Sequence, residues 1–126
     1  LTGRAAIVAN DYERRDEQAE ILREKISVII GGRAVYYLQA GKNGLNPDDM
    51  GPSFHDLSEG FGFVNSLRFS RKPGTDEPYF SATETEGFID QLLAEDGFWT
   101  VSSETLDSIS EEIAAEFGFT VEEAAN

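Results

Sequence analysis

The sequence has no cysteine and only one histidine among its 126 residues. Without cysteine, the chain cannot form disulfides, thiolate zinc sites, cysteine-ligated iron–sulfur clusters or thioether-linked haem. A catalytic centre of the Ser-His-Asp or Cys-His type would have to use His55, and no Gly-x-Ser-x-Gly elbow is present. The missing cysteine does not fix the compartment, because cytosolic and secreted proteins of this size can both lack it.

Basic residues are absent from the last 54 residues of the chain. All 10 Lys and Arg residues lie between Arg4 and Lys72, together with 10 of the 24 acidic residues. The other 14 acidic residues follow, so the formal net charge of −14 comes from residues 73–126. This balance argues against binding to nucleic acid or to an anionic membrane, because both need a basic face.

The acidic residues of the C-terminal half are expected on the solvent faces of two helices. Most surfaces mix both signs of charge, and like charges one turn apart repel, so a purely acidic face needs an explanation. Three explanations stay open: a salty medium that screens the charges, docking to a basic partner, or the capture of cations. The residues concerned are Glu84, Glu86, Asp90, Glu95, Asp96, Glu104, Asp107, Glu111, Glu112 and Glu116.

Long apolar runs are also missing. No segment approaches the roughly 18 apolar residues of a membrane-spanning helix, and no signal-peptide pattern is visible. Hydrophobic residues make up 40% and aromatic residues 11% of the chain, which is ample for a core. We expect one all-helical domain over residues 1–126. Because the chain starts at Leu1 rather than Met, we interpret it as a fragment or processed part of a longer precursor.

Helical periodicity dominates the first half of the chain. Residues 1–9 have the pattern of a short helix end, and Asn10 and Asp11 interrupt it. The longest pattern spans residues 13–41, where Ala19, Leu22, Ile26 and Ile29 recur at steps of three and four. Residues 26–38 are apolar nearly all round, which predicts burial on several sides. Gly31 and Gly32 within this stretch favour a close approach of another helix or a kink.

Three further helices are predicted after a loop over residues 42–53. Ser53 is a candidate cap for a helix whose apolar face runs from Phe54 to Leu67. Ser81 or Thr83 opens the next helix, each with a capping-box glutamate, and Gly97 closes it. Ser102 or Ser103 caps the last helix, which ends at Gly118 with Phe119 as a staple. Residues 98–101 are expected to be extended. The predicted architecture is an antiparallel bundle of four main helices plus a short N-terminal helix.

His55 and Glu59 are the candidate metal ligands. They are four residues apart on a predicted helix, so both side chains point the same way. Imidazole and carboxylate can share a divalent metal, although one or two further ligands are needed and Asp56 lies on the adjacent face. The alternative is a surface helix pair without a ligand. No cofactor is fixed by the residues, and a divalent metal or iron is the one that this pair would hold.

A second candidate is a buried polar cluster made of Arg33, Tyr36, Tyr37 and Glu24. A guanidinium in an apolar helix needs a partner, most simply the carboxylate of Glu24 or Glu59. A phenolate can bind ferric iron or haem, and Arg33 would favour that form. The alternative is that the two tyrosines are core aromatics whose hydroxyl groups reach a carbonyl.

Four segments of the sequence resemble the C-terminal half of an uncharacterised imelysin-like domain family of bacterial cell-envelope proteins. They are residues 4–24, the helix stretch from Gly32 to Leu38, residues 55–63 (His-Asp-Leu-Ser-Glu-Gly-Phe-Gly-Phe), and the close from Gly97-Phe98-Trp99 to Phe117-Gly118. His55 and Glu59 match the family's later His-Leu-Ser-Glu pattern. Tyr36 stands where the family's helix usually has His, and the Gly-x-His-x-x-Glu motif of imelysins has no counterpart.

This resemblance implies an all-helical fold and a location in the periplasm or at the outer membrane, in proteins linked to iron uptake. It predicts a non-catalytic binding protein of the cell envelope, tied to iron or another metal. The alternative is an accessory subunit of a larger assembly, which docks through helix faces or through its acidic C-terminal half. A metallopeptidase is a further alternative by analogy alone, and no catalytic residue is assigned.

Overall fold

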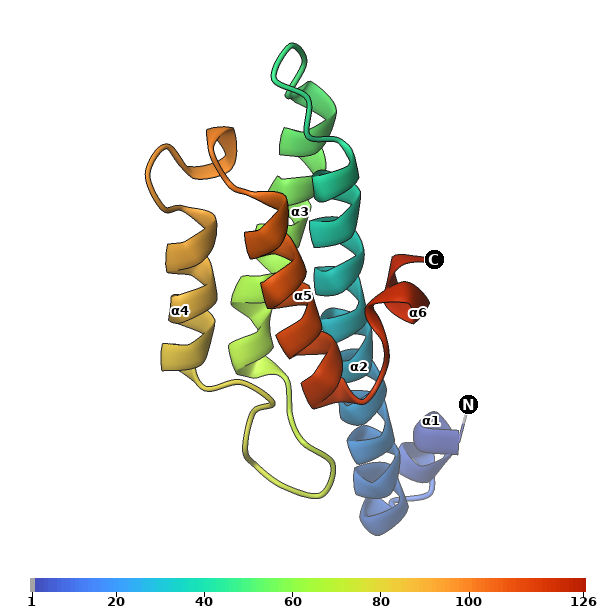
Figure 1. Ribbon diagram of the computed structural model, residues 1–126. Helices are drawn as coiled ribbons and strands as arrows, with labels where there is room; N and C mark the ends of the chain where they lie inside the picture. The colour runs from blue at the N-terminus through green and yellow to red at the C-terminus, as the bar shows by residue number, and fades with distance from the viewer. Residues whose placement is uncertain (1) are drawn as a thin grey trace.

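One long helix, α2 (Tyr12–Asn43), runs along most of the length of the molecule (Figure 1). The computed structural model describes residues 2–126, and all regular structure within that range is helical. Three helices pack beside α2 or beside each other: α3 (Gly51–Ser66), α4 (Ala82–Leu92) and α5 (Ser103–Phe117). Short pieces complete the fold: α1 (Thr2–Val8), α6 (Val121–Ala125) and two 3₁₀ turns, η1 (Leu67–Phe69) and η2 (Gly97–Trp99).

The four main helices alternate in direction, as Figure 1 shows. Helix α2 contacts both α3 and α5, while α4 packs on α3 and α5 at the side away from α2. Helices α1 and α6 both lie against α2, at its N-terminal half and near its middle. The prediction of an antiparallel bundle with four main helices and a short N-terminal helix is therefore confirmed, and α6 is an addition to it.

Side-chain caps set where most helices begin. The Asp11 carboxylate accepts the backbone N–H of Arg14 at the start of α2. Ser81 and Glu84 form a capping box at α4, as predicted, and Ser102 caps α5. Thr120 and Glu123 form a second capping box, which starts α6. At the end of α5, Gly118 takes the left-handed conformation expected of a glycine that stops a helix (φ 78°).

The core lies between α2, α3, α4 and α5. Its fully buried side chains come from all four helices and η1, and Phe80 closes it from the loop before α4. Leu38 of α2 and Leu57 of α3 are both wholly buried. The backbones of α2 and α3 approach closely at two glycines: Gly41 faces Leu57, and Gly60 faces Leu38. The Ser53 hydroxyl donates to the Gly41 carbonyl at 2.9 Å, which ties the start of α3 to the end of α2.

Several predicted boundaries are wrong by a few residues. Helix α2 continues to Asn43, and α3 begins at Gly51 with Met50 as its cap, because Ser53 uses its hydroxyl on α2 instead. Helix α4 stops at Leu92 rather than at Gly97, where the 3₁₀ turn η2 begins. Residues 98–101, expected to be extended, belong to η2 and the turn after it. The N-terminal helix matches the prediction over Thr2–Val8, and Leu1 lies outside the described residues.

The predicted burial of residues 26–38 is only half correct. From Gly31 onward the stretch supplies core residues such as Ala34, Val35 and Leu38. Ile26, Val28 and Ile29 are exposed, although they continue the same apolar pattern. The reason is geometric: the buried Ser27 and Gly31 lie on the side of α2 that faces the rest of the molecule, where the Arg71 N–H donates to the Ser27 hydroxyl. Ile26 and Ile29 lie on the opposite side of the helix.

Candidate functional site

The predicted metal ligands His55 and Glu59 lie one turn apart on the exposed face of α3. Both side chains are exposed, and Asp56 is half-buried on the adjacent face. Within residues 2–126, no group of three or more His, Asp or Glu side chains comes close enough together to hold a metal ion. The pair therefore offers two ligands from this chain, and a site here would need water or another molecule to supply the rest.

The predicted buried polar cluster is not formed. Glu24 and Arg33 are both exposed, and the salt bridges of the described residues include none to Arg33. The Arg33 guanidinium instead lies over the Tyr36 ring, 5.1 Å from its centroid. Tyr36 and Tyr37 are half-buried and meet edge to face, and Tyr37 stacks on Phe63 of α3. Because Arg33 points to solvent, it needs no internal carboxylate, and the expectation of a Glu24 or Glu59 partner is wrong.

A polar network that sequence patterns did not indicate joins α2 to α5. The Gln39 amide donates to the Asp107 carboxylate at 2.9 Å and to the Ser110 hydroxyl at 3.0 Å. Lys42 makes a salt bridge to the same Asp107 oxygen at 2.6 Å. The Lys42 ammonium and the Gln39 amide hold the pKa of Asp107 below its usual value. This network ties α2 to α5 through side chains that bond one another.

The basic residues near residue 70 also pair with the acidic half of the chain. Arg68 reaches Glu86 of α4, and Lys72 reaches Glu116 of α5 at 2.8 Å. Some of the acidic residues of the C-terminal half are therefore paired with bases of the same chain. The remaining carboxylates of α4 and α5 are exposed, as predicted for solvent faces.

An apolar face in the first half and middle of α2 is exposed to solvent. Leu22, Ile26 and Ile29 form what we call the α2 stripe, and 59%, 54% and 59% of their surfaces are exposed. Their spacing of four and three residues places them in one row along the helix. Further apolar side chains on α1 and α2 are also exposed: Ile7, Val8, Tyr12, Ile21 and Val28. An exposed row of large apolar side chains is a candidate interaction site.

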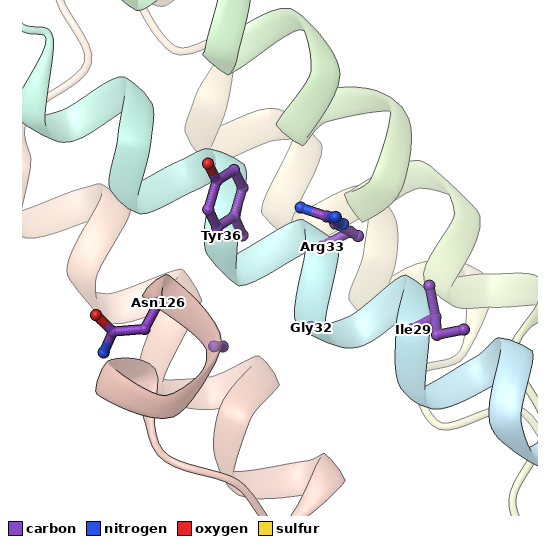
Figure 2. A pocket seen from close by; sticks show the side chains of 6 residues that line it. Ile29, Gly32, Arg33, Tyr36 and Asn126 are labelled. Atoms are coloured by element: carbon purple, nitrogen blue, oxygen red, sulfur yellow. The ribbon is translucent and has the colours of Figure 1, made fainter.

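The α2 stripe continues into a groove between α2 and α6, drawn in Figure 2. This α2 groove has a volume of about 450 Å³. It is lined by Ile29, Gly32, Arg33, Tyr36, Ala124 and Asn126. Figure 2 shows Ile29, Arg33 and Tyr36 along one side of α2, with Asn126 facing them from α6. A Cβ added to Gly32 would meet no atom within 4 Å, so the floor of the groove is open.

Comparison with known protein families identifies the family of this chain. A model described as "Domain of unknown function (DUF4856)" matches residues 1–120, nearly the whole sequence. The chain belongs to the DUF4856 family. No curated protein and no solved structure is significantly similar to it. The prediction of an uncharacterised domain family is confirmed at this level, while its link to imelysin-like proteins and to the cell envelope stays a prediction.

This DUF4856 chain also lacks, within residues 2–126, a helix long and apolar enough to cross a membrane.

The α2 stripe is the surface feature whose burial the sequence pattern predicts wrongly. The periodicity correctly places Leu22, Ile26 and Ile29 on one face, but the expectation that this face joins the core is wrong. The periodic spacing shows that these three side chains share a face. It does not show whether another part of this chain covers that face.

Proposed function

We propose that this DUF4856 chain is a non-catalytic accessory domain that docks onto another protein through the α2 stripe. The exposure of Leu22, Ile26 and Ile29 supports the proposal. Burying a Leu or Ile side chain fully is worth about 1.5–3 kcal/mol, so three such residues in a row favour association. Ile7 and Val8 of α1 are exposed as well.

Site-specific crosslinking in the source cells tests this function. A photo-reactive amino acid placed at Ile26 should form a crosslink to another protein, because the α2 stripe is covered in the assembly. The matched control places the same amino acid at Ser108, which is exposed on α5. The crosslink from position 26 should fall to the level of this control when Leu22 and Ile29 are replaced by Gln.

Three results would contradict docking onto another protein. Equal crosslinking from positions 26 and 108 would show contact without specificity, and no crosslink from either would show no contact. A crosslink to a second copy of the chain would show self-association instead.

A second candidate function is metal binding in the cell envelope, as the imelysin-like resemblance implies. The observation that favours it is the exposed His55 and Glu59 pair on one face of α3. An exposed pair with two ligands is suited to a metal shared with another molecule. The resemblance, rather than the geometry, supports the periplasmic or outer-membrane location and the link to iron.

Calorimetric titration with Fe²⁺, Fe³⁺, Zn²⁺ and Ca²⁺ tests this candidate. If the pair binds metal, we expect saturable heat with at least one ion, lost in His55→Ala and reduced in Glu59→Gln. Asp90→Asn, which removes an exposed carboxylate from α4, is the matched control. Heat that is the same in His55→Ala as in the unmodified chain would rule the site out.

A further inference from the structure

The charges beside the α2 stripe are of one sign. Lys25 lies three residues after Leu22 and four before Ile29, and Arg33 lies four residues after Ile29, so both share the face of the stripe. The acidic residues of the same segment, Glu20 and Glu24, are two residues from stripe positions and lie on the far side of the helix. The α2 side of the docking face is therefore apolar and basic, while α6, the other wall of the α2 groove, carries Glu122 and Glu123.

These two bases have no acidic partner within the described residues. The salt bridges over residues 2–126 include neither Lys25 nor Arg33. By contrast, Arg15 pairs with Asp16 and Arg23 with Glu20 on the same helix. Arg33 is held beside the α2 groove by its contact with the Tyr36 ring. A carboxylate that enters the groove would meet the Arg33 guanidinium, which its contact with the Tyr36 ring already holds in position.

One row along α2 has the alternating spacing of four and three residues at which two helices pack against each other. It consists of Leu22, Ile26, Ile29, Arg33 and Tyr36. On the partner, apolar residues would have to repeat in the same way, and acidic residues would have to flank them near Lys25 and Arg33. We infer that the α2 stripe and α2 groove bind an amphipathic helix of another protein whose flanking residues are acidic. The inference rests on the proposed docking function and names its partner by chemistry.

A second copy of this chain fits the face less well. Two copies paired through the α2 stripe would bring the same bases, Lys25 and Arg33, to one seam. The net charge of −14 on each copy would add repulsion between them. That net charge acts less on a single partner helix at the stripe, because the carboxylates of α4 lie on the side of the bundle away from α2 and charges are screened over a Debye length of about 8 Å at physiological salt. Of the acidic residues after residue 72, Glu122 and Glu123 belong to α6, which borders the α2 groove.

Peptide probes of defined charge test the inference. We would use two three-heptad amphipathic peptides with identical Leu positions, one flanked by Glu and one flanked by Lys. The unmodified chain should bind the Glu-flanked peptide at least about tenfold more tightly, as measured by fluorescence anisotropy. Arg33→Glu should abolish or reverse that preference, and Ile29→Gln should weaken binding of both peptides. Arg23→Glu, the same charge change off the stripe, should keep the preference.

Each other outcome has a distinct meaning. A preference for the Lys-flanked peptide, or no preference, would overturn the inference that the partner helix is acidic. The docking function would still stand if position 26 crosslinks to another protein in cells. No binding of either peptide, or self-association that light scattering detects, would overturn the inference. If position 26 also gives no specific crosslink, the docking function fails with it.

Discussion

Leu38→Ala should lower the free energy of unfolding by about 2–5 kcal/mol, and urea unfolding followed by far-ultraviolet circular dichroism would measure the loss. Leu38 is wholly buried in the C-terminal half of α2. Its side chain packs at one of the two glycines where α2 and α3 approach closely, 3.4 Å from the position of a Cβ on Gly60. The helices are tied together at Gly41 and Ser53 nearby, so they cannot close the cavity that the smaller side chain leaves.

Ile26→Ala is the matched control on the same helix. It also removes a large aliphatic side chain, but 54% of the Ile26 surface is exposed, so its effect on stability should stay within about 0.5 kcal/mol. An apolar residue that contributes this little to folding is available for docking. A loss at Ile26 as large as the loss at Leu38 would mean that the stripe is covered within the chain, against the proposed function.

Most of the fold could be predicted because its determinants are local. The capping box of Ser81 and Glu84, the Ser102 cap and the terminating Gly118 are each set by residues within one turn of a helix end. The apolar faces of α3 and α5 follow from their spacing. Helix α6 escapes prediction because it has only five residues, although the capping box of Thr120 and Glu123 is a signal that could have found it.

The candidate site could not be predicted in the same way. A periodic apolar face shows which side of a helix seeks cover, but not whether the covering surface belongs to the same chain. Leu38 and Ile26 belong to one apolar stretch of the sequence, yet they lie about 120° apart around α2, and only Leu38 faces α3. Likewise, the apolar neighbours of Arg33 in the sequence predict a need for a carboxylate, but its side chain points to solvent over Tyr36.

The division of charge along the chain becomes clearer in three dimensions. Lys42, Arg68 and Lys72 pair with acidic residues of α4 and α5, so they belong to the bundle. Lys25 and Arg33 are left on the face of the α2 stripe. The bundle is therefore acidic outside, while the side of α2 that is turned away from the core keeps two bases without an acidic partner in the described residues. This separation is what a docking helix for an acidic partner needs.

Two adjacent glycines of α2 should respond to alanine with opposite signs. A Cβ on Gly31 would lie 2.6 Å from the Phe117 ring, which is too close for contact. That ring stacks on Tyr79 at a centroid distance of 4.0 Å and on Phe119 at 6.0 Å, so it has little room to move. Gly31→Ala should therefore lower the free energy of unfolding by about 1–3 kcal/mol, as measured by urea unfolding.

Gly32→Ala makes the same chemical change one residue later, where a Cβ would meet nothing within 4 Å. Alanine is favoured over glycine inside a helix by about 0.5–1 kcal/mol, so this variant should be more stable than the unmodified chain. Stabilisation by both substitutions would show that the Phe117 ring moves aside freely. The α5–α6 corner would then be loosely packed, and Ala124 and Asn126 would not be held in place as one wall of the α2 groove.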